Sequence, residues 1–210
     1  MTKLTVLLDI DNTILATDSL RKHIESRLEA NYGAKALEHF YKIQEQELTK
    51  RGFYDWKQIA MKFAKSQGSS DYATVLAVFL EAPFNDYWRP GAKDLIEFLK
   101  ISSYLVIFSD GDEVFQKTKA EKLGLFEASG EVIISKSKVG LLAGIRDKSS
   151  GTVVIIDDKP GVILKAKEVI PDGITIWVKY GRYAKEEKSL GASLETENLL
   201  EVKDYIQKLQ

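Results

Sequence analysis

Leu4-Thr5-Val6-Leu7-Leu8-Asp9-Ile10-Asp11-Asn12-Thr13 is the stretch from which the fold can be predicted. Its first five residues form an apolar run whose length and composition are typical of a buried strand. Asp9 and Asp11 follow at the carboxyl end of that strand. Because strand side chains alternate between two faces, these carboxylates can point into one volume, where a cation, a raised pKa or hydrogen bonds must offset their repulsion. In the alternative interpretation, the two acids only turn the chain after the strand.

The length and charge of the chain limit its class. Its 210 residues suffice for one sizeable domain, or for a domain with a smaller one inserted. Thirty basic and thirty-one acidic side chains nearly cancel, so no overall field would attract nucleic acid or an anionic membrane. The lack of cysteine excludes disulfides and cysteine-ligated zinc. We find neither a signal-peptide pattern nor an apolar run of about 18 residues, and we expect a cytoplasmic protein with no nucleic-acid or membrane partner.

Between the first strand and residue 88 the sequence predicts only helices. Apolar residues recur every three to four positions in four consecutive segments. These stripes are Leu20, Ile24 and Leu28; Leu37, Phe40, Tyr41 and Leu48; Trp56, Ile59, Ala60, Phe63 and Ala64; and Tyr72, Val75, Leu76, Phe79 and Leu80. We interpret residues 17–87 as an inserted α-helical cap, residues 1–16 and 88–210 as the core, and the aromatic stripes as cap core rather than as a substrate pocket.

After Arg89-Pro90-Gly91 the predicted strands and helices alternate. Four further strands are expected at residues 104–108, 132–134, 153–156 and 174–178, which makes five in all. Strands that are apolar throughout and separated by single helices indicate a parallel sheet covered on both faces. The predicted fold class is therefore α/β, with a Rossmann-like parallel sheet as the core. The segment Lys179-Tyr180-Gly181-Arg182 follows the last strand. We interpret it as a solvated loop; in the alternative interpretation it borders the crevice beyond the end of the sheet.

Reactive side chains follow three of the five predicted strands. Asp9 and Asp11 follow the first strand, Ser109 follows the second, and Asp157-Asp158 follows the fourth. Ligands of an open parallel sheet bind beyond the carboxyl ends of its strands, so we expect these side chains to converge. Four acids with lysines nearby suit a magnesium ion and a phosphate group.

In these motifs the chain closely resembles the haloacid dehalogenase superfamily, a large group dominated by phosphatases. The matching residues, in chain order, are Asp9, Asp11 and Thr13, then Ser109, then Lys138 or Lys136, and then Asp157-Asp158. The resemblance covers nearly the whole chain. It implies Mg²⁺ as the cofactor and a small soluble phosphomonoester as the substrate, selected by residues of the cap.

The resemblance also implies a role for each acid. Asp9 would attack phosphorus and form an aspartyl-phosphate. Asp11 would protonate the leaving oxygen and later deprotonate the attacking water. The metal would be held by Asp9, by the main-chain carbonyl of Asp11, and by Asp157 and Asp158.

Phosphate binding is implied for a second group of residues. Ser109 would hydrogen-bond the phosphoryl group, together with main-chain N–H groups near Asp110 and Gly111. A lysine would balance the phosphate charge. We assign this role to Lys138 rather than Lys136, because Lys138 lies next to the predicted helix start, where the family places its lysine.

Three other functions remain open from the motifs. A phosphomutase of the same family differs only in the acceptor of the phosphoryl group. A receiver-type signalling domain also combines acids, a Ser or Thr and a Lys, but it would leave the helical insertion unexplained. A non-catalytic phosphate-binding regulator would have no need of Asp11. The dehalogenase branch of the family lacks the second acid of the first motif, so Asp11 argues for phosphoester chemistry.

Overall fold

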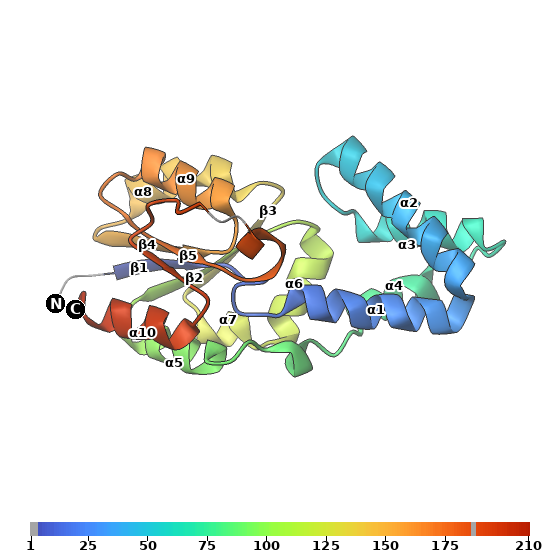
Figure 1. Cartoon of the computed structure of the whole chain (residues 1–210), viewed down its shortest axis with the longest axis horizontal. Helices are drawn as coiled ribbons and strands as arrows, with labels where there is room; N and C mark the ends of the chain where they lie inside the picture. The colour runs from blue at the N-terminus through green and yellow to red at the C-terminus, as the bar shows by residue number, and fades with distance from the viewer. Residues whose placement is uncertain (1–3, 186–187) are drawn as a thin grey trace.

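The sheet has six parallel strands in the order β3-β2-β1-β4-β5-β6 (Figure 1). The computed structural model describes residues 4–185 and 188–210. The strands are β1 Leu4–Leu8, β2 Tyr104–Asp110, β3 Glu131–Ser135, β4 Thr152–Asp157, β5 Ile174–Val178 and β6 Leu194–Thr196. The α/β class and the first five strands are confirmed. The count of five is wrong, because β6 is a three-residue edge strand without an apolar run.

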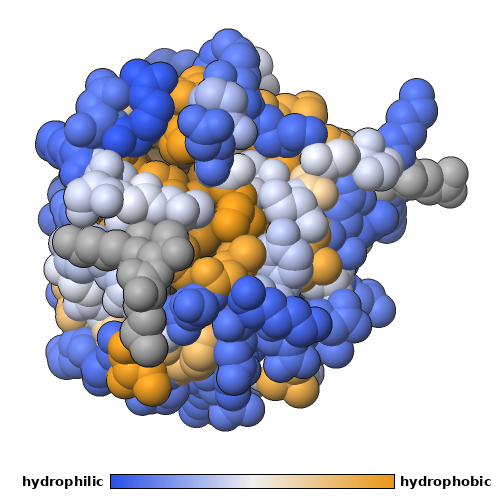
Figure 2. Space-filling model, turned by 90° about the vertical axis from the view of Figure 1, so that its left-hand side faces the viewer, coloured by the Kyte–Doolittle hydropathy of each residue, from blue (hydrophilic) through white to orange (hydrophobic). Residues whose placement is uncertain are grey.

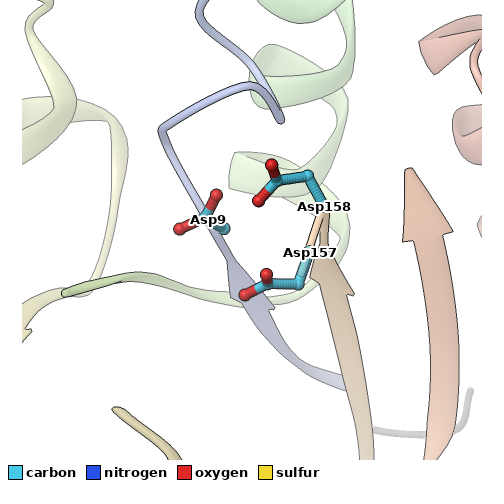
Figure 3. Close-up of side chains that lie close together, drawn as sticks. All are labelled: Asp9, Asp157 and Asp158. Atoms are coloured by element: carbon cyan, nitrogen blue, oxygen red, sulfur yellow. The ribbon is translucent and has the colours of Figure 1, made fainter. Parts of the chain in front are cut away.

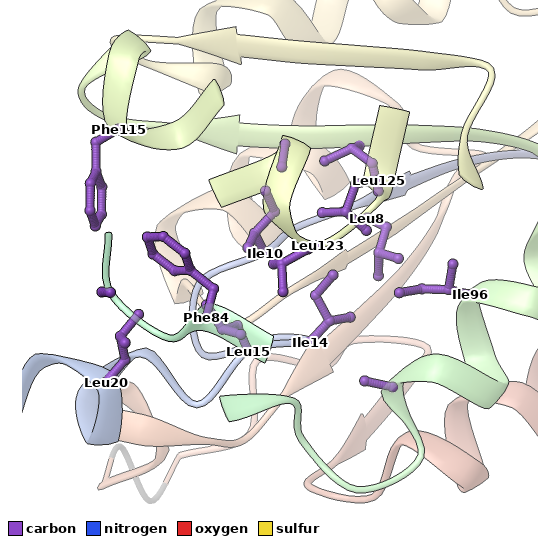
Figure 4. Close-up of a cluster of buried hydrophobic side chains, with 14 of the residues drawn as sticks. Leu8, Ile10, Ile14, Leu15, Leu20, Phe84, Ile96, Phe115, Leu123 and Leu125 are labelled. Carbon is purple, nitrogen blue, oxygen red and sulfur yellow. The ribbon is translucent and has the colours of Figure 1, made fainter. Parts of the chain in front are cut away.

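Helices cover both faces of this sheet (Figure 1). One face carries α5 Ala92–Ser102, α6 Glu113–Lys122, α7 Leu125–Ala128 and α10 Leu199–Gln207, and the other carries α8 Leu142–Lys148 and α9 Pro160–Val169. Within β1, Val6 and Leu8 belong to the first apolar layer and Leu7 to the second, as strand alternation requires. Apolar side chains from β1, from the segment that follows it and from α6 pack together in the first layer (Figure 4).

The cap consists of four helices inserted between β1 and β2, as predicted. They are α1 Thr17–Tyr32, α2 Ala34–Arg51, α3 Trp56–Ser66 and α4 Tyr72–Leu80, and the short 3₁₀ helix η1 Phe84–Tyr87 leads back to the core. The entering and leaving segments run side by side, because Ala16 N–H donates to the Tyr87 carbonyl (2.8 Å) and Arg89 N–H to the Ile14 carbonyl (3.0 Å). The domain limits at residues 17 and 87 remain a prediction.

The strand order determines where a ligand can bind. The chain first adds β2 and β3 on one side of β1 and then places β4 on the other side. The direction of chain winding therefore reverses between β1 and β4, and ligands of such sheets bind at this point, beyond the carboxyl ends of the strands. These ends point toward the cap in Figure 1.

The opposite end of the core carries the start of the sheet. Hydrophilic residues surround a band of hydrophobic ones on this face (Figure 2). Within residues 4–185 and 188–210, no helix has both the length and the apolar character needed to cross a membrane.

Candidate active site

Three aspartates meet at the carboxyl ends of β1 and β4 (Figure 3). β1 and β4 pair through Leu8 and Ile156, so the residues that follow, Asp9 and Asp157, lie side by side. One carboxylate oxygen each from Asp9, Asp157 and Asp158 lies within 4.8 Å of the others. All three residues are buried, with at most 2% of their surface exposed. The fold thus concentrates three acids where a parallel sheet binds its ligand.

The charges of this cluster are poorly balanced without a cation. Burial raises the pKa of Asp9 to about 7; the attraction of Lys138 opposes this shift, and the repulsion from Asp157 adds to it. Burial, with repulsion from Asp9 and Asp157, raises the pKa of Asp158 to about 9. In the described part of the chain, the buried Asp158 Oδ1 has no hydrogen-bond partner. Hard oxygen donors with one unpaired oxygen fit a magnesium ion.

Lys138 is the lysine that reaches this cluster. It begins the 3₁₀ helix η2 Lys138–Leu141 and is fully buried. Its ammonium forms ion pairs with Asp9 and with Asp157, the latter at 2.5 Å. Burial alone would lower the pKa of Lys138, but the two carboxylates outweigh it and raise the pKa. Lys136, the competing candidate, is exposed and its ammonium lies 5.6 Å from the ring centre of Phe53 in the cap.

The end of β2 supplies a free hydroxyl but not a free N–H at Gly111. Ser109 is fully buried, and its Oγ forms no hydrogen bond with the described residues. Asp110 is ion-paired with Lys159. The Gly111 N–H donates to the Ser135 carbonyl at 2.9 Å, so this donor is engaged within the protein. Among the phosphate-binding groups expected at this strand end, the Ser109 hydroxyl forms no hydrogen bond with the described residues and can therefore bond a phosphate.

Asp11 lies apart from the three-acid cluster. Its carboxylate accepts hydrogen bonds from Thr17 (2.6 Å) and Gln116 (2.6 Å) and is paired with Lys119 at 2.5 Å. Burial would raise the pKa of Asp11, but Lys119 and these hydrogen bonds outweigh it, and the pKa falls below its usual value. Of the four acids expected in the crevice, three bring their carboxylates together, because this local network turns the Asp11 side chain toward α6. The expected metal ligand of Asp11 is its main-chain carbonyl, and this role remains a prediction.

Three residues of this region were missing from the sequence analysis. Gln116 and Lys119 contact Asp11 from α6, and Lys159 contacts Asp110. One signal could have revealed Lys119: it follows Phe115 by four residues, so it falls on the apolar stripe of its helix. A lysine on such a stripe needs a buried partner, and Lys119 is fully buried.

Hydrogen bonds hold the turn after β1. Asn12 has a positive φ of 56°, and its side chain exchanges two hydrogen bonds of 3.1 Å with Asp18 at the start of α1. The Thr13 hydroxyl donates to Asp9 Oδ2 at 2.8 Å, which orients that carboxylate. The Arg89 guanidinium donates to the Asn12 and Thr13 carbonyls at 3.2 and 2.8 Å. These hydrogen bonds connect residues 9–13 with Asp18, where the chain enters the cap, and with Arg89, where it returns to the core.

A cleft of about 220 Å³ lies between the cap and the carboxyl ends of the strands. Asp11 and Asp158 line it from the core, and Trp56 lines it from the cap. Arg182 and Tyr183, on the 3₁₀ helix η3 Gly181–Lys185, border it as well. The preferred interpretation of residues 179–182 as a solvated loop is therefore wrong. The alternative, in which this segment borders the crevice, holds through Arg182, whose side chain is exposed.

A parallel sheet with this strand order, acids at its switch point and a helical cap after the first strand defines the class of haloacid dehalogenase-type folds. Residues 4–168 match the family described as haloacid dehalogenase-like hydrolase, and the chain belongs to this family. The resemblance stated from the sequence is thereby confirmed. No curated protein matches the chain significantly.

Several solved structures share the fold over the whole chain. A haloacid dehalogenase-like hydrolase from Burkholderia xenovorans has 24% identity and a TM-score of 0.84, covering 97% of this chain and 99% of its own. A magnesium-bound HAD hydrolase from Bacillus subtilis has 17% identity and a TM-score of 0.65, covering 98% and 99%. The L-2-haloacid dehalogenase from Xanthobacter autotrophicus has 12% identity and a TM-score of 0.64, covering all of both chains.

Proposed function

We propose that the protein is a magnesium-dependent phosphatase that acts on a small soluble phosphomonoester. The observation that carries this proposal is the buried group formed by Asp9, Lys138 and the unpaired Ser109 hydroxyl, with a second acid, Asp11, beside the same cleft. A carboxylate nucleophile, a cation and a hydroxyl donor are what attack on a phosphate ester requires.

Asp9, Asp157 and Asp158 would hold the magnesium ion, and the main-chain carbonyl of Asp11 is proposed as a further ligand. When bound, magnesium would neutralise phosphate oxygens that otherwise repel an anionic nucleophile. Lys138 already pairs with Asp9 and Asp157 and adds positive charge beside the phosphate position.

The protein groups carry out two steps. In the first step an Asp9 oxygen forms a bond to phosphorus, the bond from phosphorus to the leaving oxygen breaks, and that oxygen takes a proton from Asp11. In the second step a water oxygen attacks the aspartyl-phosphate, Asp11 takes the water proton, and the bond from phosphorus to Asp9 breaks. Inorganic phosphate is released and Asp9 is regenerated.

The surroundings of Asp11 fit the second step directly. Its pKa is lowered, so Asp11 is a carboxylate in the free protein, which is the form that accepts a proton. For the first step, the negative charge of a bound phosphate dianion would raise this pKa and favour the protonated form. Attack on carbon with a halide leaving group needs no acid, so a dehalogenase would have no use for Asp11.

A screen of phosphate release from metabolite phosphates, with and without magnesium, tests the proposal. We expect release that chelation abolishes and magnesium restores. Activity that survives exhaustive chelation would remove the metal from the mechanism. Chloride release from 2-chloropropionate without any phosphate release would make the protein a dehalogenase. A phosphomutase would instead need a bisphosphate activator and would release little inorganic phosphate.

A further inference from the structure

The cap side of the cleft is aromatic. Phe53, Tyr54 and Trp56 line it from the start of α3 and the connection before it, and all three are half-buried. The volume of about 220 Å³ is below the roughly 300–1,000 Å³ of pockets for drug-sized ligands. The cleft therefore suits a phosphate with one small leaving group.

Trp56 is held rigidly at this wall. Its ring stacks on Phe79 with a centroid distance of 4.7 Å and an interplanar angle of 29°. On the core side it lies 5.4 Å from the ring of Phe115. Its main-chain N–H donates to the Asp112 carboxylate at 3.2 Å. A fixed aromatic face binds a flat ring with little loss of conformational entropy.

Gln44 adds an unpaired polar group to the same wall. It lies on α2, lines the cleft and is only 5% exposed. Its side-chain amide makes no hydrogen bond to any residue in the described ranges 4–185 and 188–210. The amide atoms are not among the fully buried unpaired atoms of the described chain, so they reach the open space of the cleft. A ligand atom in the cleft can supply the missing partner.

Several cations also line the cleft. The Arg21 guanidinium lies 3.7 Å from a Glu25 carboxylate oxygen and 5.1 Å from the ring centre of Tyr54, and on the floor Lys119 is paired with Asp11. Lys136 and Arg182 form no ion pair with the described residues. The polar group that Gln44 meets is therefore defined by the amide, which both donates and accepts hydrogen bonds.

We propose that the substrate is the phosphate ester of a small alcohol that carries one flat ring, with a hydrogen-bonding group on that ring. The aromatic wall formed by Phe53, Tyr54 and Trp56 packs against the ring, and the Gln44 amide pairs with its polar group. This inference rests on the phosphatase function proposed above, and it revises the interpretation of the aromatic stripes as cap core alone, because Trp56 both packs in the cap and lines the cleft.

Three esters of primary alcohols test the inference at constant leaving-group chemistry: propyl phosphate, benzyl phosphate and 4-(hydroxymethyl)benzyl phosphate. The 3-isomer of the last ester tests whether the hydroxyl group reaches Gln44 better from another ring position. We expect kcat/KM to rise by about tenfold from propyl to benzyl, and by a further three- to tenfold with the hydroxyl group. Equal kcat/KM for propyl and benzyl phosphate would overturn the ring preference.

Variants separate recognition from packing. Gln44→Leu should remove the gain from the hydroxyl group, so that kcat/KM becomes equal for benzyl and 4-(hydroxymethyl)benzyl phosphate. Trp56→Leu should reduce the preference for benzyl over propyl phosphate. Gln46→Leu is the matched control, because Gln46 lies on the same helix, is exposed and does not line the cleft. If Gln44→Leu lowers kcat/KM equally for all esters, its role is structural and the inference is wrong.

Non-hydrolysable phosphonates distinguish this inference from the proposed function. In the presence of magnesium, calorimetry should show that benzylphosphonate binds about tenfold more tightly than propylphosphonate. A protein that shows this preference but releases no phosphate from any ester, 4-nitrophenyl phosphate included, would retain the ring site and lose the phosphatase function. Equal affinity for both phosphonates would exclude the ring site whatever the turnover.

Discussion

Asp9 and Asp11 lie two residues apart but have different surroundings. Burial and the repulsion from Asp157 raise the pKa of Asp9, against the attraction of its partner Lys138. Asp11 is turned toward α6, where Lys119 holds it in the ionised form. Environments that shift the pKa values of two carboxyl groups in opposite directions are typical of residues with different chemical roles.

Substitution of the two acids by asparagine should inactivate the protein in different ways. Asp9→Asn lacks the nucleophile, so no phosphoenzyme should form with any substrate. Asp11→Asn cannot protonate the leaving oxygen, so turnover of an alkyl phosphate should fall by about 10²- to 10⁴-fold and that of 4-nitrophenyl phosphate much less. Rapid-quench measurement of phosphoenzyme and kcat on both esters checks this. Equal losses of Asp11→Asn on both esters would contradict its role as an acid.

The two candidate lysines can be separated by alanine substitution. Lys138 contacts Asp9 and is buried, whereas Lys136 is exposed near Phe53. We expect Lys138→Ala to lower kcat by well over tenfold, since a charged hydrogen bond contributes about 1.5–3 kcal/mol. Lys136→Ala should change kcat only a few-fold. Steady-state kinetics on one ester are enough, and the reverse ranking would transfer the role to Lys136.

At the scale of elements, η3 packs against the turn after β1. An added Cβ at Gly181 would lie 2.6 Å from the Asn12 side chain, and Gly181 has a φ of +68°. Asn12 in turn bonds Asp18 at the start of α1. A change at Gly181 should therefore reach both the first motif and the cap.

Gly181→Ala should cost more stability than Gly124→Ala. Gly124 has nearly the same φ, +67°, but its nearest contact to an added Cβ is at 3.9 Å. Both substitutions place alanine in the left-handed region, at a cost of about 1 kcal/mol, or about 2–4 °C in Tm. Only Gly181→Ala also displaces Asn12, so its loss in Tm should be at least about twice as large, with reduced kcat/KM. Calorimetry of both variants tests this, and equal losses would show that the close contact is without effect.

Most elements could be predicted from sequence because their apolar periodicity is local. β6 could not, since it is short, contains one leucine and pairs only with β5 at the sheet edge. The cluster of Asp9, Asp157 and Asp158 follows from strand ends in a parallel sheet. The pairing of Asp11 with Lys119 does not, because it joins residues 108 positions apart on a strand end and a helix.

At the scale of the whole molecule, the cap and core share one apolar cluster. Leu20 and Phe40 of the cap belong to the same cluster as Leu8 and Ile96 of the core. The second cluster, beneath α8 and α9, contains core residues only. The cluster of Asp9, Asp157 and Asp158 lies at the ends of β1 and β4, strands that contribute to both apolar clusters, so its charge state should affect the stability of the whole core.

Magnesium should stabilise the protein against unfolding. The raised pKa values of Asp9 and Asp158 mean that their stabilising contribution is full below pH about 4, their unfolded value, and is lost as pH rises through about 7 and about 9. At neutral pH both groups are ionised in the unfolded chain, whereas the metal-free fold keeps Asp158 protonated, and this difference destabilises the metal-free fold. Magnesium at 100 times its Kd should add about 2.7 kcal/mol, or about 5–10 °C in Tm. At one fixed magnesium concentration the rise in Tm should be larger at pH 8 than at pH 6, because metal binding displaces protons.

Asp158→Asn provides the control for this effect. Without magnesium the variant should be at least as stable as the natural chain, because one repelling carboxylate is gone. With magnesium its rise in Tm should be much smaller. Scanning calorimetry over both pH values measures this, and an undiminished rise would place the metal elsewhere.

Removal of residues 17–87, with a short linker joining the ends, tests the proposed domain limits. All six strands and α5 to α10 lie outside the deletion, and the cluster beneath α8 and α9 is untouched, so the remaining chain should fold. It should be less stable, because Phe84 is removed from Phe115, which it contacts at a ring distance of 5.8 Å.

A second truncation, of residues 17–83, retains Phe84 and should therefore have the higher Tm of the two. Both should hydrolyse 4-nitrophenyl phosphate slowly and show no preference between benzyl and propyl phosphate, because Gln44 and Trp56 are absent. Circular dichroism, thermal denaturation and the two ester assays measure these outcomes. If neither truncated chain folds, the cluster shared by Leu20 and Leu8 is indispensable, and residues 17–87 are part of the main core rather than a separate cap domain.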